Sequence, residues 1–173
     1  EDEKSEDGSS PLDRWHLEAE GHKLRYVPST LPDMLDISKV CPSALPENHG
    51  AGAAVENVLS GLDLHDRDIE IAMPVQIVQD LTTQTGIWRG VPAKTCKMQL
   101  QYLAVTCKDC YPALRIHLYD GAEIYSAPFT VFGKLRAAVY IGDAYLVITA
   151  ADQVRAFVKR FDHLVRQSIV GPD

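Results

Sequence analysis

The residues best suited to chemistry in this sequence are its cysteines, of which Cys107 and Cys110 form a Cys-x-x-Cys pair. Together with Cys96, and with His117 as a further ligand, they could supply the thiolates and imidazole of a tetrahedral zinc site. A second such pair is missing, and Cys96 and Cys107 fall on the apolar face of a predicted helix, where a free Cys packs as a small hydrophobe. The sequence therefore favours structural thiols and predicts no metal or other cofactor, with a Cys96, Cys107 and Cys110 site as the alternative.

Other catalytic and phosphate-binding patterns fit the sequence poorly. A redox role for Cys107 is disfavoured because it lies near the predicted C-terminus of a helix, where the helix dipole opposes a thiolate. No histidine stands in a motif that ties it to a cysteine as a base. The string from His49 to Ala54 lacks the last glycine of GxGxxG, since Val55 stands there. We therefore predict no catalytic residue.

Aromatic and polar side chains near the predicted strands give the most suggestive binding site, because small-molecule pockets are mainly apolar with a few placed polar groups. The same strands also carry Tyr140 and Tyr145. The plain alternative is that these tyrosines pack on half-buried strands with wet hydroxyls. A second alternative is a small enzyme whose site is built from Trp88, Arg89, His117, Glu123 and nearby tyrosines. The predicted ligand-binding residues are Trp88, Arg89, Tyr102, His117, Tyr119, Tyr125 and Phe129.

The elements that position these side chains follow from the spacing of apolar residues. Residues 12–26 suit a passage from a short helix to a strand, and residues 51–62 and 76–81 suit helices. Residues 92–106 predict a longer helix, whose apolar face carries Cys96, Leu100, Leu103 and Cys107. Strands are predicted at 69–75, 114–119, 129–132, 137–141 and 145–148, and the last four of these should form an antiparallel meander.

The last predicted helix is the clearest element. Thr149 and Asp152 resemble a capping box, and an apolar stripe continues to about Ser168. Its other face is basic, which would suit an acidic partner or would simply be solvated: Arg155, Lys159, Arg160 and Arg166. The fold class is therefore α+β, a small antiparallel sheet packed with helices that include a long C-terminal amphipathic helix. Residues 1–10 read as an acidic linker or tail and 11–173 as one effector-like domain.

The charge distribution argues against several partners. The net charge is −7, and residues 1–20 hold eight acids against two bases. With a pI of about 5.3, the segment is not expected to bind nucleic acid directly. No apolar run approaches the roughly 18 residues of a membrane span. Four cysteines without a disulfide pattern fit a reducing, cytoplasmic setting, and the Met-less start suggests a segment excised from a longer protein.

Five strings in the C-terminal half follow one another in a recognisable order: CKMQLQYLA, YPALRIHLYDG, SAPFTVF, AAVYIGDAYLVI and TAADQVRAFVKRFDHLVRQSI. In order and spacing they resemble the C-terminal domain that follows Xre-type helix-turn-helix modules in actinobacterial regulators. Pro32-Asp33-Met34-Leu35 only hints at that family's PGLLQT motif, and its DEAALRR-like segment is not recognisable at 75–82.

This resemblance implies a ligand-sensing or dimerising regulatory domain whose DNA-binding module is absent from this chain. It also implies a homodimer, because operators of such regulators tend to be two-fold symmetric. A small-molecule ligand or a regulatory protein would supply the signal. A pure protein-interaction module, bound through the C-terminal helix or an exposed strand, is the remaining alternative.

Overall fold

The computed structural model describes residues 11–37, 67–142 and 144–172. The predicted tail at 1–10 and the predicted helix at 51–62 lie outside these residues. The helices and strands are, in chain order, α1 (Pro11–Glu18), β1 (Leu24–Val27), η1 (Asp33–Leu35), β2 (Ile69–Pro74), α4 (Val75–Thr83), η3 (Gly86–Trp88), α5 (Ala93–Asp109), β3 (Leu114–Tyr119), β4 (Phe129–Phe132), β5 (Arg136–Tyr140), β6 (Tyr145–Ile148), α6 (Ala151–Arg166) and β7 (Ser168–Val170).

A mixed sheet forms the centre of the described part, with seven strands in the order β6-β5-β4-β1-β2-β3-β7. Strands β1, β2 and β3 are parallel, and every other neighbouring pair is antiparallel. The α+β class is confirmed, but the small, wholly antiparallel sheet is wrong. β4, β5 and β6 form the predicted meander, whereas β3 is separated from β4 because β1 and β2 lie between them.

Burial explains why β2 takes a central place. Its residues from Ile69 to Met73 are all buried, so both faces of the strand are covered. Parallel strands need helices on both faces of the sheet and therefore read as continuous apolar runs. In β2 the acidic Glu70 is the exception within that run.

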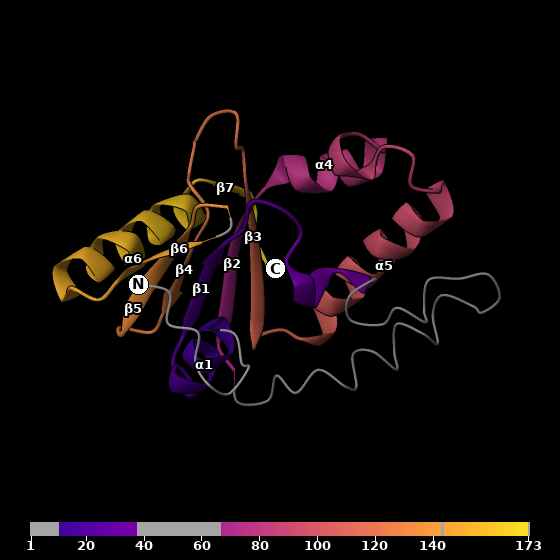
Figure 1. Ribbon diagram of the computed structural model, residues 1–173. Coiled ribbons are helices and arrows are strands. Elements are labelled where there is room, and N and C mark those ends of the chain that lie inside the picture. The colour runs from indigo at the N-terminus through magenta and orange to yellow at the C-terminus, as the bar shows by residue number, and fades with distance from the viewer. Residues whose placement is uncertain (1–10, 38–66, 143, 173) are drawn as a thin grey trace.

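Helices cover both faces of the sheet (Figure 1). On one face, α1, η1, α4 and α5 pack against Leu24, Ile69 and Leu114. On the other, α6 packs against Val27 and Val131. Among the described helices, α6 is the one that covers this second face, and part of the face is left to polar side chains.

The long helix α5 presents the predicted face to the core. Cys96 and Leu103 are buried, and Leu100 and Cys107 pack against the same cluster. Cys96, Cys107 and Cys110 are free thiols, as the sequence predicts for these three. The four positions are spaced so that each lies over the next turn, which is why they share one stripe.

Helix α6 differs from the prediction at both ends. Its N-cap is Ala150, with no side-chain capping bond, so the predicted Thr149 capping box does not form. At the other end it stops at Arg166, and Ser168 begins β7 instead of ending the helix. The apolar stripe itself is confirmed: Val154, Phe161 and Leu164 are buried.

Candidate ligand-binding site

A cavity of about 380 Å³ lies on the sheet face that carries α1 and η1. Its walls come from β1, β4, β5, β6 and the segment from Ser29 to Met34 that leads into η1. We call it the tyrosine pocket, and its lining residues are His16, Leu24, Tyr26, Ser29, Thr30, Pro32, Asp33, Met34, Ile69, Pro128, Phe129, Thr130, Ala138, Tyr140 and Tyr145.

The strand register creates this hollow. Tyr26 of β1 pairs with Thr130 of β4, which pairs with Ala138 of β5, so the three side chains form one row on one face. Thr130 and Ala138 are small, and they leave the middle of the row open. Tyr140 and Tyr145 pair across β5 and β6 with ring centroids 5.3 Å apart, and they form an aromatic rim beside it.

The polar groups of the pocket converge on Asp33. Burial, and then the nearby Asp33 carboxylate, raise the pKa of Tyr26. Burial, then Tyr140 and then Asp33 raise the pKa of Tyr145. Both phenols therefore keep their protons at neutral pH and can donate hydrogen bonds. A carboxylate beside aromatic faces makes the pocket suitable for a positively charged group.

The wall around Asp33 is held by two buried side chains of α5. Gln99 donates from Nε2 to the carbonyl of Leu35 at 2.6 Å and accepts at Oε1 from the backbone N–H of Ile37 at 2.9 Å. The hydroxyl of Tyr102 donates to the carbonyl of Met34 at 3.0 Å. These bonds satisfy polar groups that are buried, and so they fix the position of η1.

Helix α1 closes the pocket from another side. The Trp15 ring meets Phe132 and Tyr145 edge-on, with centroids 5.9 Å and 6.1 Å apart. The Arg136 guanidinium lies over Trp15, 5.6 Å from its centroid, and forms an ion pair with Glu18. These contacts attach α1 to β4, β5 and β6, the strands that carry the pocket floor and rim.

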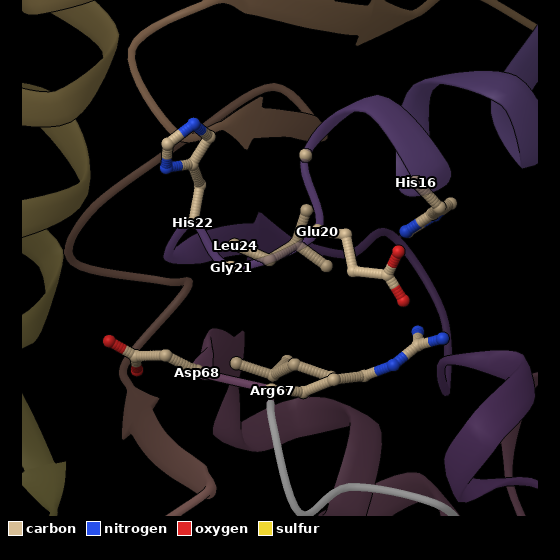
Figure 2. Close-up of a pocket in the computed structure, with 9 residues that line it drawn as sticks. His16, Glu20, Gly21, His22, Leu24, Arg67 and Asp68 are labelled. Carbon is tan, nitrogen blue, oxygen red and sulfur yellow. The ribbon is translucent and has the colours of Figure 1, made fainter.

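A second, much smaller hollow of about 30 Å³ lies beside the end of α1. In it the Glu20 carboxylate points toward the ring of His16 and the guanidinium of Arg67, while His22 and Asp68 point away (Figure 2). The space holds no more than a water molecule or two. We therefore interpret it as a small polar contact region between the end of α1 and the start of β2, not as a ligand site.

A buried ionic cluster is centred on Glu70 of β2, on the face of the sheet opposite the tyrosine pocket. Its Oε1 is 3.0 Å from His117 Nε2 and 3.9 Å from Arg115 Nε, and its Oε2 pairs with Lys23 Nζ. Burial by itself raises the pKa of Glu70, but hydrogen bonds from His117 and Lys23 and the charges of Lys23 and Arg115 outweigh it and hold the pKa at about 2. Glu70 therefore stays ionised, which suits a structural anion and not a proton donor at neutral pH.

The structure does not bring the sequence-predicted ligand residues together. Tyr119 and Phe129 share the cluster under α6, and Phe129 is also part of the tyrosine pocket. The others are separated: Trp88 packs at η3, Arg89 and Tyr125 are exposed, Tyr102 holds η1 and His117 bonds Glu70. The residues proposed for an enzyme site are likewise divided between η3, the Glu70 cluster and the exposed Glu123.

The surroundings of the thiols give no support to the alternative of a metal site at Cys96, Cys107 and Cys110. Burial, and then Cys110, raise the pKa of Cys107, and burial, and then Asp109, raise the pKa of Cys110. Cys96 is buried in the core. Among the described residues, no three or more His, Cys, Asp or Glu side chains are grouped so that they could hold a metal ion.

Comparison with known proteins gives no relative for this chain: it matches no protein-family model, no curated protein and no solved structure. Within the residues that the structure describes, no helix is long and apolar enough to cross a membrane. The function must therefore be argued from the site itself.

Sequence reasoning missed the centre of the tyrosine pocket, namely Tyr26 and Asp33. Tyr140 and Tyr145 stood out as aromatic residues but not as part of a site. One signal was available: two successive strands each carry a small residue among larger ones, Thr130 in β4 and Ala138 in β5, and these two residues are cross-strand partners. The contribution of β1 could not be inferred, because its pairing with β4 spans about a hundred residues of sequence and follows no local pattern.

Proposed function

We propose that this chain is the ligand-sensing domain of a helix-turn-helix transcription regulator and that the tyrosine pocket is its sensing site. The observation that carries the proposal is the pocket itself, about 380 Å³ with an apolar floor and a few convergent polar groups. Its size lies within the range of small-molecule sites. The link to a helix-turn-helix partner is supported by the order of motifs in the C-terminal half.

The chemistry of the lining favours a small organic cation with an apolar body. The three tyrosine rings can offer negative π-faces, and the Asp33 carboxylate acts on both Tyr26 and Tyr145, so the lining disfavours an anion. The floor of Leu24, Ile69 and Ala138 would contact apolar parts of the ligand. An aryl or alkyl ammonium compound satisfies both requirements.

A thermal-unfolding screen tests this function. Aryl and alkyl ammonium ions should raise the unfolding midpoint of the chain, and neutral compounds of the same shape should raise it less. A ligand at a hundred times its Kd stabilises the native state by about 2.7 kcal/mol. Tyr145→Ala should weaken binding by roughly tenfold, since a cation–π contact contributes about 0.5–2 kcal/mol.

The matched control is Tyr125→Ala, because Tyr125 is 80% exposed and lies outside the pocket. It removes the same ring and should leave the midpoint shift unchanged. Equal effects of the two variants, or a shift produced only by anionic or neutral compounds, would contradict the proposal.

Self-association is a second candidate function, supported by the edge strand β6. Among the strands that the structure describes it pairs only with β5, and Tyr145, Leu146 and Val147 are 39%, 56% and 40% exposed. Edge strands of stable monomers usually carry charges, prolines or bulges that prevent pairing, and Tyr145–Ile148 has no charge and no proline. We infer that two copies pair through β6 to form a homodimer.

Solution mass tests the dimer directly. Leu146→Lys places a charge on the edge and should convert the dimer to a monomer without loss of helix or strand signal, because Leu146 is largely exposed. Leu17→Lys, at another residue that is 67% exposed, is the control and should leave the mass unchanged. A wild-type chain that stays monomeric at high concentration would exclude this interface.

A further inference from the structure

A further cavity, of about 500 Å³, lies between the N-terminal half of α6 and the sheet, on the face opposite the tyrosine pocket. We call it the basic cavity. Half of its lining residues are cations and none is acidic, although the whole chain carries a net charge of −7. The lining residues are Arg25, Gly133, Lys134, Ala151, Val154, Arg155, Val158 and Lys159.

The helical repeat of α6 explains the mixture of apolar and basic groups. The five α6 residues that line the cavity are spaced as one helical stripe. Val154 is buried and Val158 is partly buried, so they form an apolar floor. Arg155 and Lys159 follow them by one position and are exposed, so their charges stand at the rim.

The turn between β4 and β5 keeps the other side of the cavity open. Gly133 has a φ of +57°, and a Cβ there would lie 2.8 Å from the Cβ of His22. Its N–H donates to the carbonyl of Lys23 at 3.0 Å. Only glycine allows the turn to approach β1 this closely, and the approach brings Lys134 to the rim.

Arg25 has a buried hydrogen-bond donor that lacks an acceptor in the described part of the chain. It is the cross-strand partner of Glu70, yet both oxygens of Glu70 are already engaged by Lys23 and His117. The Nε of Arg25 is buried and has no hydrogen-bond partner among the described residues. A buried guanidinium donor without an acceptor is costly, and the guanidinium charge of Arg25 lies beside the cavity, where it would attract an anion.

The N-terminus of α6 adds to the positive charge around the basic cavity. Ala151 is both the first residue of this 16-residue helix and part of the cavity lining. Its N-cap, Ala150, makes no side-chain capping bond, so the first-turn N–H groups are not bonded by their own cap. The positive end of the helix dipole therefore reinforces the four cations, and the exposed Asp152 of the first turn, which does not line the cavity, offsets part of this effect.

From these observations we propose that the basic cavity binds a small organic anion that combines an apolar body with a carboxylate, sulfonate or phosphate group. The apolar body lies on Val154 and Val158, and the anionic group is bound by Arg25, Arg155 and Lys159. A cavity of this volume takes a small molecule, whereas a flat basic face would suit a nucleic-acid backbone. This site is separate from the tyrosine pocket, and the proposal does not depend on the sensing function.

The probe is anilinonaphthalene sulfonate, an anion with an apolar ring system, titrated into the full chain by fluorescence. Phenylnaphthylamine, which has the same rings without the sulfonate, is the neutral comparison. The double variant Arg155→Gln/Lys159→Gln removes two exposed cations from the rim and should weaken sulfonate binding by at least about tenfold, because hydrogen bonds to charged groups are the strong ones. Binding of the neutral dye should stay unchanged.

Two controls separate the outcomes. Lys97→Gln/Arg166→Gln removes the same charge from exposed positions outside the cavity and should leave sulfonate binding unchanged. Tyr145→Ala should also leave it unchanged, so a failure of the sensing proposal would not be confused with a failure here. Equal losses in the cavity and control double variants would overturn the proposal. Displacement of the dye by short duplex DNA but not by inorganic phosphate would overturn it too, since it would identify a nucleic-acid surface.

Discussion

The ionic cluster around Glu70 allows a quantitative prediction about stability. Its pKa is held at about 2 in the folded chain, against an ordinary value of 4.5. A shift of one unit corresponds to about 1.36 kcal/mol, so ionised Glu70 contributes about 3 kcal/mol to folding at neutral pH. Its side chain is only 12% exposed, so little of this is screened by solvent. Glu70→Gln should therefore lower the free energy of unfolding by about 3 kcal/mol at pH 7.

The pH dependence gives the decisive test. A depressed folded-state pKa means that the stabilisation is complete above pH 4.5 and is lost as pH falls toward 2. Urea unfolding at pH 7 and at pH 3 should show the gap between wild type and Glu70→Gln shrink by roughly half.

Asp68→Asn is the control for this variant. Asp68 also pairs with Arg115, but its side chain is 49% exposed, so its loss should cost less than about 1 kcal/mol. A constant gap for Glu70→Gln from pH 7 to pH 3 would refute the assignment of the stabilisation to the ionised carboxylate.

Two further substitutions test how the sites are positioned. Gln99→Ala should cost about 3 kcal/mol in urea unfolding because it leaves two buried backbone groups unsatisfied, and it should weaken ligand binding in the tyrosine pocket; the exposed Gln101→Ala on the same helix should change neither. Gly133→Ala should cost more than Gly142→Ala. Both have positive φ, but an added Cβ meets His22 only at Gly133, so equal losses would show that the close approach is unimportant.

Local patterns predicted most helices and strands correctly because their periodicity reflects burial on one side. Helices α4 and α5 and the β4–β6 meander are of this kind, whereas β2 is buried on both faces and was predicted from its continuous apolar run. The order of the strands in the sheet was not predicted correctly. Sequence neighbours usually pair, and on that basis β3 was placed beside β4; in fact β1 and β2 separate them, since their parallel pairing joins distant segments.

The candidate sites were harder to predict because each depends on side chains from several strands. Tyr102 illustrates the difficulty: an aromatic residue near the sheet suggests ligand binding, yet its hydroxyl bonds Met34 and positions the pocket wall instead. The basic face of α6 was visible in the sequence, but only the fold shows that Arg25, from a strand far away in the chain, completes the cavity beside it.

Strand β1 connects the two cavities, because Tyr26 lines one and its neighbour Arg25 lines the other on the opposite face. The strand is bonded to β2 and to β4 along its length, so a ligand in either cavity can move side chains but cannot readily shift this backbone. Coupling between the two cavities should therefore be weak. The tyrosine pocket also contacts β6, which is bonded on one side only and carries the exposed apolar edge.

A ligand that moves Tyr140 and Tyr145 can therefore alter the pairing edge at little cost. If two copies pair through β6 as proposed, occupancy of the tyrosine pocket should change the dimerisation constant, and by reciprocity dimerisation should change ligand affinity by the same factor. Sedimentation with and without ligand measures the first quantity, and titration at two protein concentrations measures the second. If ligand leaves the dimerisation constant unchanged, or if only a ligand of the basic cavity alters the mass, then the signal does not pass through the β5–β6 hairpin.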